Sequence, residues 1–187
     1  MSRILIINGS PSATSRTGQL LSHFAGQLTE DGWQVSELAL RTLPAEALLS
    51  ADFNALPLTA AARDVAQADA IVVATPVYKA AYTALLKAFL DVLPQQALAD
   101  KSVLPIASGG TLAHYGVIDY ALKPVLSALG ATYTLPGFFV LDADLKTAQG
   151  GAGFNPEILS RLESSRVALN HLHRIDAAAV PLRHYGS

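Results

Sequence analysis

The feature of this chain that most constrains its fold is the alternation of short apolar segments with longer amphipathic ones. Segments typical of strands occupy residues 3–8, 34–40, 69–75, 102–107 and 137–141. Apolar residues recur at helical spacing over residues 15–30, 45–49, 58–67, 81–92, 114–129 and 156–173. Continuously apolar strands need cover on both faces, and strands that alternate with helices form parallel sheets. The sequence therefore predicts an α/β fold, a doubly wound five-stranded parallel sheet with helices on both faces.

Composition and charge limit the domain organisation and the partners. The chain has 187 residues, 51% of them hydrophobic, and no linker divides it, so we expect a single domain over residues 1–187. Its 13 basic and 15 acidic side chains give a net charge of -2, which offers no attraction for nucleic acid or an anionic membrane. With no cysteine and no basic segment before an apolar one at the N-terminus, we expect a cytoplasmic protein. The glycine-rich segment 149–153 is expected to be a mobile loop.

The first predicted strand runs into a loop of small hydroxyl residues, which reads GSPSATSRT over residues 9–17, and then into a helix. The N–H groups and hydroxyls of such a loop, with the N-terminus of the helix, bind phosphate groups. The loop lacks the lysine of G-x-x-x-x-G-K-[ST] and the glycines of G-x-G-x-x-G, so we expect a terminal monophosphate. Taken alone, the segment is equally compatible with an ordinary strand-to-helix turn.

The loops after the third and fourth predicted strands suit a flat ring. Residues 75–82 read TPVYKAAY, with an aromatic side chain beside a rigid proline. Residues 108–114 read SGGTLAH, where two glycines let the main chain approach a planar ligand. In a doubly wound sheet, ligands bind beyond the carboxyl ends of the strands. The loops together predict a site for a phosphate linked to a flat heterocycle.

These loop motifs, with DYALKPVLSAL at residues 119–129, resemble the NADPH-dependent FMN reductases of flavodoxin-like fold. The resemblance is greatest to the reductase components of two-component alkanesulfonate monooxygenase systems, and it weakens after Leu141. It implies the strand order 2-1-3-4-5, FMN and NADPH as cofactors, hydride transfer to flavin N5, and delivery of reduced FMN to a partner monooxygenase. Because the flavin carries the chemistry, no side-chain nucleophile is needed.

The resemblance also implies the site residues. The residues that would hold the FMN phosphate are Ser10, Ser15, Arg16 and Thr17. Those that would meet the isoalloxazine and the ribityl chain are Thr75, Pro76, Val77, Tyr78 and Lys79. Those that would line the other edge of the ring are Ser108, Gly109, Gly110 and Thr111. The chain departs from the family at Ser12, where relatives often carry arginine, so Arg16 becomes the candidate cation for the phosphate.

The histidines do not form a metal site or a catalytic constellation. His171 and His173 lie two positions apart near a helix end, so their side chains diverge. His114 follows the third loop at an expected helix start, and it is included among the cofactor-binding candidates. For this residue a contact with the ligand and a capping or packing role both stay open.

Pro124 interrupts the helix predicted over residues 114–129. Proline has no N–H, so the carbonyl of Tyr120 loses its partner four residues on, and we expect a kink or a π-bulge around Tyr120. In the family that the chain resembles, a tyrosine in a π-helix at this position lies at a subunit interface and is linked to flavin release. The helix predicted over 81–92 is more apolar than one sheet face requires. Burial in the core of one subunit explains this apolar surface equally well. The resemblance favours a homodimer or homotetramer built on this helix and the Tyr120 helix.

Two other functions stay open. A quinone or azo-compound reductase uses the same hydride step with another acceptor, and a flavodoxin-type electron carrier shares the fold and the flavin site. Such carriers tend to be strongly acidic with aromatic residues flanking the ring. This chain is near neutral, and its single tryptophan, Trp33, lies at the start of the second predicted strand, away from the loops. The sequence does not decide between FMN and a quinone as the acceptor.

Overall fold

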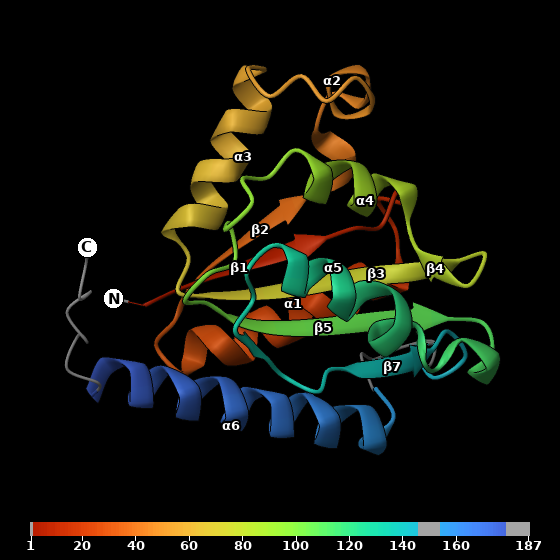
Figure 1. The fold of residues 1–187 in the computed structure, drawn as a ribbon. Coiled ribbons are helices and arrows are strands. Elements are labelled where there is room, and N and C mark those ends of the chain that lie inside the picture. Colours follow the sequence, from red (N-terminus) through yellow and green to blue (C-terminus); the bar gives the residue numbers. More distant parts are fainter. Residues whose placement is uncertain (1, 146–153, 179–187) are drawn as a thin grey trace.

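A computed structural model describes residues 2–145 and 154–178 (Figure 1). Within these ranges the strands are β1 (Arg3–Asn8), β2 (Gln34–Ala39), β3 (Ala70–Tyr78), β4 (Ala81–Tyr82), β5 (Ser102–Gly109), β6 (Tyr133–Thr134) and β7 (Phe138–Leu141). The α-helices are α1 (Arg16–Glu30), α2 (Ala45–Leu49), α3 (Leu56–Gln67), α4 (Ala84–Asp91), α5 (Lys123–Ala128) and α6 (Pro156–Ala178).

The strands form one twisted sheet. Strands β2, β1, β3 and β5 lie side by side in this order and run parallel. Strands β6 and β7 pair with successive parts of β5, while β4 pairs antiparallel with the end of β3. The predicted α/β architecture with a parallel sheet is confirmed. The prediction of five strands in the order 2-1-3-4-5 is wrong, because the described residues form seven strands. Five of these follow the order β2-β1-β3-β5-β6, while β4 pairs with β3 and β7 pairs with β5.

The two extra strands have a simple physical origin. Strands β4 and β6 have two residues each, too few to show a period-two pattern. Strand β3 does not end at Pro76, as its apolar run predicts, but continues to Tyr78 and turns back into β4. The helix predicted from residue 81 therefore begins only at Ala84.

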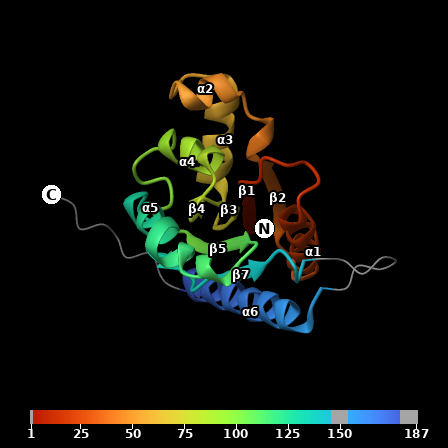
Figure 2. The ribbon, with the colours of Figure 1, turned by 90° about the vertical axis from the view of Figure 1, so that its right-hand side faces the viewer.

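Helices cover both faces of the sheet, as predicted (Figures 1 and 2). Ile4 and Ile6 face a core formed with α1 and α6, whereas Leu5 and Ile7 face a core formed with α3, α4 and α5. This division follows from the alternation of side chains along a strand. None of the helices within the described ranges combines the length and the apolar character needed to cross a membrane.

The segment predicted as one helix over residues 114–129 is three pieces. A 3₁₀ turn (Leu112–His114) and a π-helical turn (Ile118–Leu122) precede α5. The π-helical turn contains Tyr120, so the bulge expected from Pro124 is confirmed. The expected mobile loop at residues 149–153 lies outside the described residues.

Candidate functional site

The three loops of the predicted site leave the sheet at the same edge. Asn8 at the end of β1 is paired with Ala74 of β3, and Pro76 of β3 is paired with Ser108 of β5. The main-chain N–H of Gly9 donates to Ala74 O at 2.8 Å, which extends the sheet into the first loop. The loops after β1, β3 and β5 therefore surround one region beyond the carboxyl ends of the parallel strands, as the rule for such sheets requires.

The first loop is built around buried hydrogen bonds at its start. Ser10 is 2% exposed, and its N–H donates to Asn8 Oδ1 at 3.0 Å. Its Oγ accepts from the N–H of Ser12 at 3.3 Å. The Nδ2 of Asn8 donates to Glu37 Oε1 at 2.9 Å, which fixes the orientation of the Asn8 amide. The hydroxyl of Ser10 thus shapes the loop, and Ser12, where relatives often have arginine, is exposed.

The loop then delivers the chain to the N-terminus of α1. Ser15 is the N-cap residue, and its Oγ accepts from Gly18 N at 3.0 Å. The N–H groups of Arg16 and Thr17, at the first two helical positions, have no acceptor within the helix. These two N–H groups and the positive end of the helix dipole face the loop. The exposed start of α1 is therefore equipped to bind an anion.

The side chains of Arg16 and Thr17 take different directions. Arg16 is exposed, and its Nη1 donates to the main-chain carbonyl of Asp142, beyond β7, at 3.2 Å. Thr17 and Ser108 are both buried, and their hydroxyl oxygens lie 2.8 Å apart in a hydrogen bond. This bond joins α1 to the end of β5. The structure therefore leaves Arg16 accessible to a ligand and uses the two hydroxyls to hold two loops together.

The second loop is a tight hairpin. Val77 pairs with Tyr82 and Tyr78 with Ala81, so the turn consists of Lys79 and Ala80 alone. Both turn residues have positive φ, 49° and 64°, the conformation of a two-residue type I′ turn that usually selects glycine or asparagine. Neither residue here is of that kind, so the turn stores backbone strain.

The π-helical turn contacts this hairpin. The hydroxyl of Tyr120 donates to Ala80 O at 2.8 Å, and the side chain is 56% exposed. Tyr78, at the end of β3, is 54% exposed. Burial raises the pKa of the Tyr82 phenol. Two exposed aromatic side chains thus flank a strained turn at the edge of the site.

The third loop contains two glycines with different surroundings. A Cβ on Gly109 would lie 3.1 Å from Cζ of Phe139, so the close packing of this ring favours glycine. A Cβ on Gly110 would meet only Asp142 Oδ2, at 4.0 Å, so the space beside Gly110 is open. Thr111 accepts from Ala113 N at 3.3 Å and begins the 3₁₀ turn. The loop therefore offers main chain without side chains at Gly110, as a flat ligand requires.

His114 ends this third loop. Its Nδ1 is buried, and in the described part of the chain no group hydrogen-bonds to it. Buried polar atoms are rarely left without a hydrogen-bond partner. The structure keeps His114 beside the site and leaves one of its ring nitrogens for a further partner.

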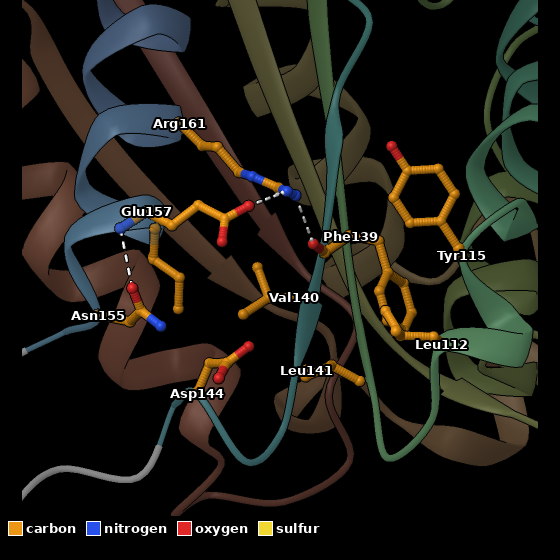
Figure 3. A pocket seen from close by; sticks show the side chains of 10 residues that line it. Leu112, Tyr115, Phe139, Val140, Leu141, Asp144, Asn155, Glu157 and Arg161 are labelled. Atoms are coloured by element: carbon orange, nitrogen blue, oxygen red, sulfur yellow. Dashed lines mark hydrogen bonds and ion pairs between the residues drawn. The ribbon is translucent and has the colours of Figure 1, made fainter.

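A cavity of about 290 Å³ lies on the outer side of β7 (Figure 3). Arg161 of α6 is paired there with Glu157 and also donates to Phe139 O at 3.1 Å. Tyr115 and Leu112 line its other side. The guanidinium of Arg161 is already bound to a carboxylate and a carbonyl, so the residues that line the cavity offer no free cation. It does not contain the residues of the predicted phosphate loop.

Sequence reasoning missed Asn8, Thr83 and Asp142, which form hydrogen bonds to the residues of the loops. Thr83 is 2% exposed and is the N-cap of α4, accepting from Leu86 N at 3.1 Å. The N-cap preference for threonine could have identified Thr83, had the helix not been predicted to begin at residue 81, three residues before its observed start. The described residues contain no group of acidic residues or histidines placed to hold a metal ion.

The fold is flavodoxin-like, and comparison with known proteins identifies the family. Residues 2–146 match the sequence model of a family described as NADPH-dependent FMN reductase. The chain is 48% identical over 147 residues to an FMN reductase (NADPH) of Pseudomonas putida, covering 79% of this chain and 75% of the relative. It is 41% identical over 175 residues to an FMN reductase (NADPH) of Escherichia coli, covering 93% and 92%.

A solved structure agrees with this result. The apo crystal structure of an NADH:FMN oxidoreductase matches with a TM-score of 0.81 and 37% identity, over 91% of this chain and 88% of that one. The chain belongs to the NADPH-dependent FMN reductase family. It is an oxidoreductase whose cofactors are FMN and NADPH.

Proposed function

We propose that FMN binds with its phosphate at the loop after β1 and its ring between the loops after β3 and β5. The observation that carries this proposal is the meeting of these loops at one edge of the sheet, with the start of α1 beside them. The free N–H groups of Arg16 and Thr17 and the hydroxyl of Ser15 suit a phosphate. The open space beside Gly110 suits a flat ring. The donor set and the shape thus fit FMN.

Each group of residues then has a defined role. Ser10 keeps the first loop in shape, while Arg16 turns from Asp142 O to the phosphate and supplies the positive charge that Ser12 does not. The residues along one side of the ring are Thr75, Pro76, Val77, Tyr78 and Lys79, and those along the other are Ser108, Gly109, Gly110, Thr111 and His114. In this arrangement the chain supplies position and hydrogen bonds, and FMN, when bound, supplies the redox chemistry by accepting a hydride from NADPH.

The finer function that we propose is the supply of reduced FMN to a separate, alkanesulfonate-type monooxygenase by a homo-oligomer. The π-helical turn supports this role, because Tyr120 is exposed and also bound to the strained hairpin beside the ring. Ala80, whose carbonyl accepts from Tyr120, and Ala84, at the start of α4, are both exposed and would offer small side chains to another subunit. An assembly contact at Tyr120 would act directly on the loop that holds the flavin. FMN is then a substrate that leaves after each turnover.

The dependence of turnover on added flavin tests this proposal. Protein passed through a desalting column should lose FMN, and its NADPH oxidation should then rise with added FMN to saturation. A quinone or azo-compound reductase keeps FMN as a bound group. Retention of stoichiometric FMN, with NADPH oxidation that does not respond to added FMN, would refute the proposal. Light scattering on the same sample measures the oligomeric state.

A further inference from the structure

Thr83 contacts both halves of the site, although it is buried beneath them. Its Oγ1 donates to Gly9 O at 2.8 Å, at the start of the phosphate loop. Its N–H donates to Thr75 Oγ1 at 3.2 Å, at the start of the ring loop. The hydroxyl of Thr75 in turn donates to Pro76 O at 2.9 Å. One residue is therefore bonded to the first residue of each loop.

The same hydroxyl also begins α4. It accepts from Leu86 N at 3.1 Å as the N-cap of that helix. Gly9 and α4 are closely packed, because a Cβ on Gly9 would lie 3.1 Å from Leu86 Cβ and 3.0 Å from Ala74 O. Gly9 is thus packed against the first turn of α4, and the hydroxyl of Thr83 fixes the gap between them. Without it, a buried carbonyl and a helix N–H both lose their partner.

We propose that Thr83 is a positioning residue that sets the spacing between the phosphate loop and the ring loop. The inference rests on the proposed placement of FMN across these loops. FMN joins a phosphate and a ring through a ribityl chain, so its affinity depends on both loops being engaged at once, at a fixed separation. Riboflavin has no phosphate and engages only the ring loops. A residue that sets the spacing must therefore matter more for FMN than for riboflavin.

The test compares the two flavins on apoprotein by quenching of flavin fluorescence. In Thr83→Val, which keeps the shape but removes the hydroxyl, the Kd for FMN should rise about tenfold, and that for riboflavin no more than about threefold. Thr83→Ser, which keeps the hydroxyl, should restore the wild-type ratio of the two constants. Thr29→Val is the matched control, because it removes a threonine bond of 2.8 Å to Ala25 O on the exposed face of α1.

A merely structural role predicts a different result. In that case Thr83→Val lowers the melting temperature but changes both dissociation constants by the same factor, and this outcome would overturn the inference. If the valine variant does not fold, Thr83→Cys keeps the size with a much weaker hydrogen-bonding group and is expected to show the same loss of discrimination. Failure of wild-type protein to prefer FMN over riboflavin would instead refute the placement of the phosphate. The two failures are thus separable.

Discussion

Replacing Arg16 with alanine should weaken the binding of FMN and leave the binding of riboflavin almost unchanged. Arg16 is the exposed cation at the start of α1, and in the free protein its guanidinium donates to a neutral carbonyl, Asp142 O, at 3.2 Å. Binding of FMN exchanges this bond for one to a charged phosphate. The guanidinium is charged in both bonds, and only the phosphate adds a charged acceptor, so we take the exchange to favour FMN by about 1–1.5 kcal/mol.

This difference corresponds to a roughly 5- to 13-fold higher Kd for FMN in the variant. Titration of apoprotein with FMN and with riboflavin, at one ionic strength, measures it. Arg63→Ala is the matched control, because Arg63 is an exposed arginine whose Nε donates to Thr59 O within its own helix, α3. Ser15→Ala is less informative alone, since loss of the N-cap bond destabilises α1 by about 0.5–2 kcal/mol in addition. Equal losses for FMN and riboflavin in Arg16→Ala would place the phosphate elsewhere.

Three further predictions follow from the structure. Deletion of Tyr120 should convert the π-helical turn into α-helix and remove the hydrogen bond to Ala80 O. The variant should then keep more FMN on gel filtration and change its oligomeric state. A flavin content and a mass equal to those of the wild-type protein would contradict this prediction. Gly110→Val should fold normally, since a Cβ there meets nothing closer than 4.0 Å, yet reduce FMN-dependent NADPH oxidation at least tenfold, and unchanged turnover would remove this loop from the site. Burial lowers the pKa of Lys101, so below pH 10.5 the unfolded state binds more protons than the folded state, and the free energy of unfolding rises with pH. Urea unfolding at pH 8 and pH 10 should therefore show a smaller rise in Lys101→Met than in the wild-type protein. An equal rise in the two proteins would contradict the assignment.

The fold class could be predicted because it depends on local pattern. The apolar run of β1 and the helical spacing along α1 are properties of consecutive residues, and their alternation along the chain restricts the topology. The π-helical turn was predictable for the same reason, since the missing N–H of Pro124 acts on a carbonyl only four residues away. The carboxyl edge of the sheet then followed from a general rule of parallel sheets.

The contacts that shape the site could not be predicted because their partners are distant in sequence. Thr83 and Gly9 are 74 residues apart, and Thr17 and Ser108 are 91 apart. No pattern in a single sequence indicates that these hydroxyls form hydrogen bonds to such distant residues. The sequence therefore did not indicate that the side chains of Thr17 and Ser108, both candidates for contact with FMN, bond to each other.

The hairpin was missed for a related reason. Ala81 and Tyr82 fit the helical pattern of the residues that follow, and only their pairing with Val77 and Tyr78 makes them a strand. The positive φ of Lys79 and Ala80 carries no signal in sequence, since neither residue is glycine or asparagine. Tertiary pairing thus overrode local propensity here.

We propose that this protein reduces FMN as a substrate that it then releases. The most direct measurement is steady-state NADPH oxidation by flavin-free protein, with FMN, riboflavin, a quinone and an azo dye compared as acceptors. We expect saturable turnover with FMN, a lower kcat/KM with riboflavin, and no turnover with the quinone or the dye unless FMN is added. Full turnover with the quinone or the dye when one FMN is supplied per protein molecule would contradict this expectation, because FMN would then act as a bound group.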